Sequence, residues 1–385
     1  MTRVHIALLP RDGLFCKDGR GWFTSASGRG HGLEWPWPST ILGALRTAWG
    51  RAEEDRANVC FDPGDWLTRT APIELGRMIA LRRPHGAPWA TEHLTWPAPL
   101  DAVWFEGEQE IQRLDPQQPK LPTLGRDEDE AREALWAPSL IRTEKPGKLP
   151  IWLSHADLVA WLTGQALRAP GQESLALARR LQVHVGIRGE ELTADEGVLF
   201  SHDVVETLEP RAEWAIGVEV CLPGEALPAV ATVGSDARPI RIESLPKALF
   251  DPPEELLTAF HLGSVGLRMV VATPACFARG WLPDGLIEQG SQYRGQLADL
   301  GEVVLRAAFI PRPIHISGWD MAAAAPKTTA RMVGTGAVYF FERADGRPFK
   351  ETDARALWLA ALGARTNEGF GRVVPGVWNP TRSNQ

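Results

Sequence analysis

Apolar residues near the start of the chain follow two different spacings. Residues 3–10 (RVHIALLP) form a nearly continuous apolar run, which is typical of a buried strand. After a glycine-rich stretch, apolar side chains recur at positions 41, 44, 45, 48 and 49, the spacing of one helix face. The pattern predicts a strand followed by a helix. Ser39 or Thr40 is a suitable residue to cap the start of that helix.

The middle of the chain is less periodic. Residues 58–150 are rich in Pro, Trp and charge, and DEDEAREALW at 127–136 favours an exposed acidic helix. Residues 154–164 favour another helix, because Ser154 and Asp157 have the spacing of a capping box. Strand-like runs follow at 181–188, 197–208, 214–222 and 238–245.

The last third of the chain has the clearest pattern. Strands are predicted at 265–272, 303–310, 332–341 and 370–374. A helix interrupted by Gly295 is expected at 291–300. A second helix, capped by Thr352, is expected to run to about Leu362 before Gly363. The resulting order is β-α-β-β-α-β, the ferredoxin-like arrangement.

We therefore expect an α+β protein with two ferredoxin-like, RRM-like domains. The first domain is expected at 1–252 with a large insertion, and the second at 253–385, with the boundary near Asp251-Pro252-Pro253. A length of 385 residues is more than one compact core usually holds. No internal sequence repeat is visible that would support a duplication.

The net charge of −7 argues weakly against a nucleic-acid binder, but the charge is unevenly distributed. Residues 101–134 contain ten acidic and four basic residues, whereas 1–51 and 306–350 each contain seven basic and three acidic residues. A polyanion responds to the local field, so these two basic regions matter more than the total.

The rest of the composition is that of an ordinary cytoplasmic protein. The four cysteines are scattered rather than paired, which favours reduced thiols over a zinc site or a disulfide framework. No apolar run is long enough to span a membrane, and no signal peptide is recognisable. No His spacing indicates a metal site and no catalytic cluster stands out, so we expect no cofactor, no metal and no enzymatic activity.

The first candidate site is NEGFGRVVPG at 367–376. Gly369 and Gly371 flank Phe370, and Arg372 follows. Paired glycines allow a backbone to approach a phosphate closely, and Arg372 adds a planar charged fork. The order of helix, glycines and strand is the reverse of a dinucleotide fingerprint. The alternatives are an RNA-facing loop and an ordinary helix-to-strand turn.

The second candidate site lies at 313–342. It contains Trp319, Lys327 and Arg331, with Gly334 and Gly336 inside a strand-like pattern. An exposed Trp beside cations suits a single-stranded nucleic acid, since the ring stacks on a base and the cations meet phosphates. The alternative is a Trp319 packed in the core with solvated cations.

The third candidate site is the N-terminal glycine-rich stretch. Lys17 and Arg20 lie there, before a helix start at Ser39 and Thr40, and helix N-termini bind anions well. The stretch lacks the Lys and Ser or Thr of a phosphate-binding P-loop. A surface loop without a ligand is the alternative.

Four stretches of the chain resemble one family. They are LFCKDGRGWF with WPWPSTILGALRTAWG, VHVGIRGEELTADEGVLF, ISGWDMAAAAPKTTARMVGTGAVYFFE, and NEGFGRVVPGVW. The family is the RAMP subunit that caps the guide-RNA 5′ handle in type III-B (Cmr) CRISPR complexes. One departure is that four residues, not five, separate Gly371 from Gly376, which puts a role for Gly376 in doubt.

The resemblance implies a non-catalytic subunit that binds the crRNA 5′ handle. It also implies docking to the large polymerase-like subunit and to a backbone RAMP subunit. Arg46 and Arg188, which lie in two of the matching stretches, join the expected RNA-binding residues. A RAMP endoribonuclease that processes precursor RNA is the main alternative, with His315, Lys327 and His31 as conceivable catalysts. A Trp-rich protein-interaction module without RNA contact is a third.

Overall fold

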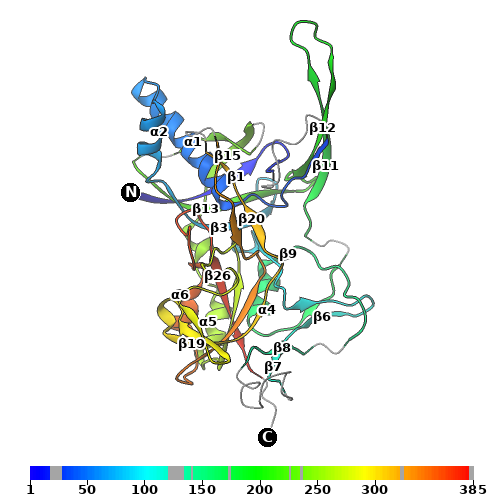
Figure 1. Cartoon of the computed structure of the whole chain (residues 1–385), viewed down its shortest axis with the longest axis vertical. Helices are drawn as coiled ribbons and strands as arrows, with labels where there is room; N and C mark the ends of the chain where they lie inside the picture. Colours follow the sequence, from blue (N-terminus) through cyan, green and yellow to red (C-terminus); the bar gives the residue numbers. More distant parts are fainter. Residues whose placement is uncertain are drawn as a thin grey trace.

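Two large antiparallel sheets dominate the chain and lie one above the other along its long axis (Figure 1). The computed structural model describes residues 1–17, 28–119, 134–139, 142–171, 175–224, 227–234, 237–320 and 325–380. The expected α+β class is confirmed. None of the described helices is long and apolar enough to cross a membrane.

The first sheet has helix α1 (Pro38–Ala57) on one face and the second half of the chain on the other. Ile6 and Leu8 pack with α1, whereas Ala7 and Leu9 join a core shared with the second half. Both faces of β1 are buried, which explains why residues 6–10 are apolar without alternation. The strands, in sheet order, are β14 (Val230–Val233), β15 (Arg238–Ser244), β1 (Thr2–Pro10), β13 (Ala212–Leu222), β3 (Glu74–Pro84), β4 (Leu94–Pro97) and β9 (Trp152–Ser154).

The second sheet also has seven strands. In sheet order they are β17 (Leu286–Gln289), β18 (Gln292–Gln296), β19 (Glu302–Phe309), β24 (Val338–Arg343), β16 (Gly266–Val271), β26 (Arg372–Trp378) and β25 (Ala360–Ala361). Helices α5 (Glu254–His261) and α6 (Glu351–Leu357) pack on each other and on β26. Helix α4 (His155–Leu162) contacts β26 from the first half, and α2 (Pro63–Thr70) packs on α1.

Smaller elements decorate the two sheets. A long hairpin projects from the first half (Figure 1), formed by β11 (Ala178–Ile187) and β12 (Ala194–Glu206), with β2 (Gly28–Gly30) beside β12. The other short strands are β10 (Leu167–Arg168), β6 (Glu110–Arg113), β5 (Ala102–Val103), β7 (Pro116–Gln117), β8 (Ala137–Pro138), β20 (Ile314–Ile316), β23 (Ala330–Met332), β21 (Trp319–Asp320) and β22 (Ala325–Pro326). Single 3₁₀ turns are η1 (Thr91–His93), η3 (Lys247–Phe250) and η4 (Ala298–Leu300).

A buried ion pair joins the first half of the chain to the second sheet. Nε of Arg268, on β16, lies 2.9 Å from Oδ2 of Asp101, and both side chains are almost fully buried. Trp161 completes the contact, because its indole N–H donates to Asp101 and its carbonyl accepts from Arg268. Removing the Arg268 charge would leave the Asp101 carboxylate buried without its cation, which costs about 3–5 kcal/mol. Removing Asp101 would leave Arg268 with Asp115, 3.5 Å away.

Two predicted helix boundaries are wrong. Helix α1 begins at Pro38 with Trp37 as its N-cap, so Ser39 and Thr40 lie inside the first turn instead of capping it. Helix α6 begins at Glu351 after Lys350 and ends at Leu357, short of Leu362. The helix cannot continue, because Leu359 has a φ of +55° and the next two residues pair with β26 as β25.

The predicted helix at 291–300 is also wrong. Residues 292–296 form strand β18, which pairs with both β17 and β19. Gly295 is the reason, since its φ is +153° and a Cβ there would lie 2.1 Å from the carbonyl oxygen of Gly285. The acidic helix expected at 127–136 falls largely outside the described residues. The last strand begins at Arg372, two residues later than expected.

Candidate nucleic-acid interface

A cleft of about 970 Å³ lies between the first turn of α1 and the small hairpin of β21 and β22. It brings together five of the residues that the sequence singled out from separate stretches: Lys17, Ser39, Thr40, Trp319 and Lys327. Among the residues that line it, three are cations and one is a carboxylate. The cleft is therefore locally basic within a chain of net charge −7.

The small hairpin presents an aromatic ring and a cation side by side. Trp319 is 44% exposed and pairs across the hairpin with Pro326. The backbone N–H of Lys327 donates to the carbonyl of Gly318, and the Lys327 side chain is exposed. A ring that stacks on bases and a cation that meets phosphates are the two elements of a single-strand site.

The opposite wall of the cleft is the start of α1. Ser39 and Thr40 are half-buried there, and the first turn contains no acidic residue. The start of this 20-residue helix carries the positive end of the helix dipole, and the Thr40 N–H there donates to the carbonyl of Trp37. The wall is therefore favourable to an anion.

The glycine loop lies behind this cleft rather than on its surface. Gly369, Phe370 and Gly371 are all buried, so the expectation of an RNA-facing loop is corrected for these three residues. A Cβ on Gly371 would lie 2.0 Å from the carbonyl oxygen of Leu362, at a φ of +73°. A Cβ on Gly369 would lie 2.8 Å from Leu75 of the first half. The glycines are thus needed for close packing.

Phe370 supports the cleft from behind. Its side chain is fully buried in a small cluster with Ile316 and Met332, and Trp37 packs against the same cluster. The cluster joins the two strands that lead to the small hairpin with the residue that caps α1. Direct contact between Phe370 and RNA is incompatible with this burial, which leaves the ring a supporting role.

Arg372 and Arg46 are engaged by the main chain. The guanidinium of Arg372 donates to the carbonyl of Thr366, and burial lowers its pKa to about 10. The guanidinium of Arg46 donates to the carbonyls of Ala71 and Ile73, and burial again lowers the pKa. Both residues stabilise turns behind the cleft and do not present an open charged fork.

The floor of the cleft holds an ion pair. Arg365 and Glu368 are joined by two hydrogen bonds of 2.8 and 2.7 Å. Burial acts to raise the pKa of Glu368, but the Arg365 hydrogen bonds and the charges of Lys327 and Arg46 outweigh it and keep the pKa lowered. The Lys327 charge is thus close enough to Glu368 to lower the pKa of that carboxylate.

Two other predicted residues, Arg331 and Arg188, lie elsewhere. Arg331 is exposed on β23, opposite His315, and lines neither this cleft nor the pocket described next. Arg188 lies near the end of the projecting hairpin, where its Nε is 3.2 Å from Asp195. Arg20 falls outside the described residues. Gly376 is buried, and its lack of a side chain lets α4 approach β26, since a Cβ would lie 2.9 Å from Leu162.

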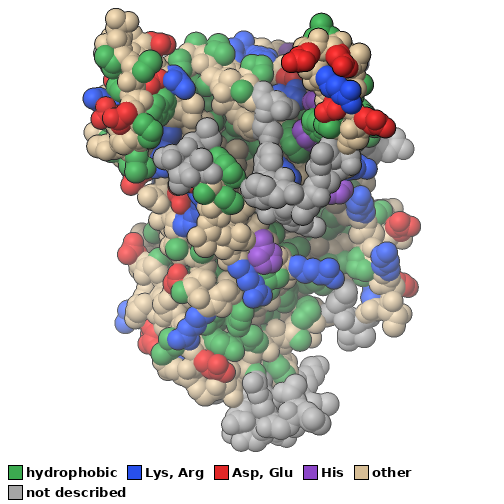
Figure 2. Space-filling view, turned by 45° about the horizontal axis from the view of Figure 1, so that its top comes forward, with side chains coloured by type: hydrophobic (Ala, Val, Ile, Leu, Met, Phe, Trp, Pro, Cys, Tyr) green, Lys and Arg blue, Asp and Glu red, His purple; other side chains and the backbone are tan. Residues whose placement is uncertain are grey.

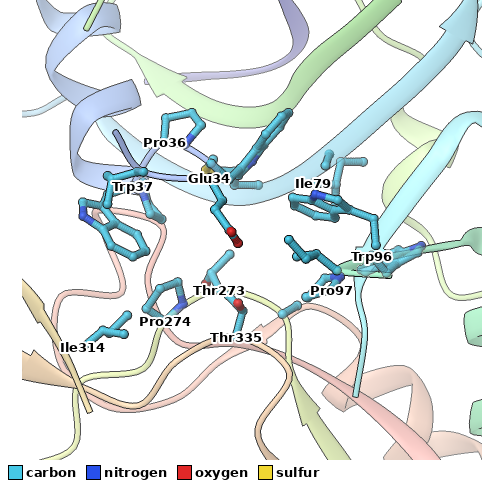
Figure 3. A pocket seen from close by; sticks show the side chains of 18 of the residues that line it. Glu34, Pro36, Trp37, Ile79, Trp96, Pro97, Thr273, Pro274, Ile314 and Thr335 are labelled. Carbon is cyan, nitrogen blue, oxygen red and sulfur yellow. The ribbon is translucent and has the colours of Figure 1, made fainter. Parts of the chain in front are cut away.

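A second pocket, of about 860 Å³, shares Trp37 with the cleft. Trp and Pro side chains from both halves contribute nine of its 23 lining residues, including Trp37, Trp96 and Pro274 (Figure 3). Sequence reasoning missed this pocket, because its walls come from seven separate stretches of the chain. The dense EWPWP run at 34–38 was the one local signal available.

Charged side chains are unevenly distributed over the surface. Figure 2 shows Lys, Arg and His side chains near the middle of one face, whereas acidic side chains stand out toward its edges. Within the described residues, no group of three or more His, Cys, Asp or Glu side chains is arranged to hold a metal ion.

Comparison with known proteins gives one strong match. The model of the family described as CRISPR-associated protein (Cas_Cmr3) matches residues 6–378. No curated protein sequence matches the chain.

Solved structures offer only distant likenesses. A chain in a cryo-electron microscopy structure of a type III-B Cmr-beta complex bound to cognate target RNA and AMPPnP is 14% identical. The match covers 87% of this chain and 86% of that chain with a TM-score of 0.41. A chain in a crystal structure of a type III-A Csm3-Csm4 subcomplex is 9% identical, covering 98% of this chain and 100% of that chain with a TM-score of 0.32. These low TM-scores carry no argument, so the family model alone carries the assignment.

Proposed function

The chain belongs to the Cas_Cmr3 family of CRISPR-associated proteins, and from this premise we propose that it is a non-catalytic RNA-binding subunit of a type III-B CRISPR effector complex. In this role it anchors the 5′ handle of the crRNA. It also docks the large polymerase-like subunit and a backbone RAMP subunit, in the cytoplasm. The single observation that carries the RNA-binding role is the convergence of Lys17, Trp319 and Lys327 in one cleft.

The residues of the cleft fit a single-stranded RNA better than a small metabolite. The cleft is open and about 970 Å³ in volume, with exposed aromatic and cationic groups on one wall and hydroxyls on the other. Stacking and phosphate contacts need no deep cavity, because an RNA strand presents its bases and its phosphates along its whole length. In the proposal, Lys327 contacts a phosphate, Trp319 stacks on a base, and Ser39 and Thr40 donate to phosphate oxygens.

The proposal includes two diverged ferredoxin-like domains, at 1–252 and 253–385. In the first sheet the order β15, β1, β13, β3 places the last strand beside the first, as does the order β26, β16, β24, β19 in the second. Each sheet keeps one crossover helix, α1 in the first and α6 in the second. The other crossover contains β14 in the first domain, and β17 and β18 in the second.

The proposal assigns no catalytic residue. Acid–base cleavage of RNA requires a proton donor and an acceptor within reach of one ribose. The ring of His31 lies 3.5 Å from Asp203, which also pairs with Arg29, and the ring of His184 stacks on Phe200. His315 and His31 both line the Trp pocket, which makes them the pair to test for the endoribonuclease alternative.

In the deciding experiment, the chain and its partner subunits are incubated together with labelled repeat RNA or guide RNA. Retention of guide RNA that depends on the 5′ handle, without cleavage, supports the proposal. Cleavage without added metal that disappears in His31→Ala or His315→Ala supports the endoribonuclease instead. If the assembled complex retains handle-less RNA equally well, this subunit does not anchor the handle.

A further inference from the structure

The Trp-walled pocket has a composition that phosphate binding does not explain. Its residues include Trp35, Trp37 and Trp152, several prolines and the carboxylate of Glu34. In Figure 3 the Glu34 carboxylate points into the middle of the pocket, toward Thr273 and Thr335. An anion at this position repels phosphate, so the chemistry of the pocket differs from that of the neighbouring cleft.

The aromatic walls are rigidly held. The ring of Trp35 makes edge contacts with Trp152 at 5.2 Å and with Trp214 at 6.1 Å. The indole N–H of Trp214 is in turn fixed by a 2.6 Å hydrogen bond to Glu209. Walls that contain interlocked indoles and prolines suit a planar, apolar-faced ligand, and they lose little entropy on binding it.

The carboxylate oxygens of Glu34 are available to accept hydrogen bonds from a ligand. Its side chain is 59% exposed, and the Arg179 guanidinium lies 4.0 Å from it, beyond hydrogen-bond distance. No hydrogen bond from another described residue satisfies this carboxylate. An ionised carboxylate is acceptor-only, and its two oxygens match two adjacent N–H donors.

We infer that this pocket takes one unstacked nucleobase of the bound RNA and prefers guanine, read by Glu34. Of the four RNA bases, guanine alone presents two adjacent N–H donors on its Watson–Crick edge. Adenine and cytosine place a ring acceptor beside their amino group, and uracil offers one N–H between two carbonyls. The inference rests on the proposed function, because the strand that delivers the base lies in the adjoining cleft.

The geometry of the two cavities fits one strand. Trp37 lines both cavities. When a phosphate of the strand lies near Ser39 or Lys327, the base of a neighbouring nucleotide can enter the pocket beside the Trp37 ring. A volume of about 860 Å³ has room for a purine nucleotide. A proline-rich peptide is the competing occupant, but it would leave the Glu34 carboxylate without donors of matching geometry.

The test uses the full-length chain and the four nucleoside monophosphates, read by quenching of tryptophan fluorescence. GMP should bind tightest, and Glu34→Gln should reduce the preference for GMP over AMP by roughly ten- to a hundred-fold. AMP, CMP and UMP affinities should stay the same or improve, because a negative charge is removed. Glu288→Gln, an exposed glutamate on β17, is the matched control and should change nothing.

A parallel measurement separates this inference from the proposed function. Handle-length RNAs with a single guanine moved along a uridine background should show one preferred position, lost in Glu34→Gln. If guanine is not preferred, or if Glu34→Gln weakens all bases alike, the inference is overturned. If a proline-rich peptide binds and GMP does not compete, it is likewise overturned. Handle binding that still depends on Lys327 would leave the proposed function standing in each case.

Discussion

The glycine loop at 367–372 and the small hairpin of β21 and β22 each carry one aromatic and one basic residue, yet only the hairpin presents both to the cleft. The loop presents Phe370 inward and engages Arg372 with main-chain carbonyls. The hairpin presents Trp319 and Lys327 outward, into the cleft. The role of an arginine or aromatic residue near glycines therefore cannot be assigned from the sequence alone. The same side chain contributes to packing when it is buried and to binding when it is exposed.

The comparison predicts different phenotypes for the two regions. Substitutions in the loop should act through folding, and substitutions in the hairpin should act through RNA affinity.

Gly371→Ala should be strongly destabilising. The substitution forces a side chain into left-handed backbone and against the Leu362 carbonyl, for a total of about 3–4 kcal/mol. Gly346→Ala is a matched control, because Gly346 has a nearly equal φ of +71° but nothing within 4 Å of the added Cβ. The control should cost only about 1–2 kcal/mol. Urea unfolding measures both, and equal losses would show that packing at Gly371 is unimportant.

Lys327→Ala should weaken guide-RNA binding by about 1.5 kcal/mol, roughly tenfold, without lowering the melting temperature. Each lost phosphate contact with a single strand should also reduce the slope of log affinity against log salt by about 0.7. The measurement is a salt series with the partner subunits present. An unchanged slope would remove Lys327 from the phosphate site, and a loss confined to one handle sequence would indicate base reading instead.

Arg331→Ala and Arg188→Ala should have small effects on the same assay. Arg331 lies beside the cleft without lining it, so a loss of about twofold through the long-range field is the most we expect. Arg188 is paired with Asp195 and lies among acidic residues on the projecting hairpin, where phosphate would be repelled. A tenfold loss in Arg188→Ala would show that the strand runs along that hairpin.

Glu368 should make a small, pH-dependent contribution to stability. Its pKa in the folded chain is lowered from the ordinary 4.5, so the stabilisation is present above that pH and is lost as the pH falls through the folded-state pKa. Glu368→Gln should therefore reduce the acid sensitivity of the melting temperature below about pH 4.5. It should also slightly strengthen RNA binding, since a carboxylate leaves the cleft floor. Identical acid sensitivity in both proteins would assign that sensitivity to other carboxylates.

Local sequence patterns were sufficient to predict β1, α1 and α4. The apolar run at 3–10 and the helical spacing after Ser39 identify β1 and α1, and Ser154 caps α4 through the backbone N–H of Asp157 as its spacing predicted. These features depend on residues a few positions apart, so the sequence by itself determines them. The candidate residues of the cleft, Lys17, Trp319 and Lys327, were also visible as residue types.

Tertiary structure decided which of those candidates share a surface. Gly295 became part of a strand because two neighbouring strands were available to pair with it, and Phe370 became buried because Trp37 and Ile316 close over it. The Trp pocket exists only where distant stretches meet, with Glu34 at its centre. Burial and hydrogen bonding depend on neighbours supplied by the whole fold, which is why no local pattern could assign them.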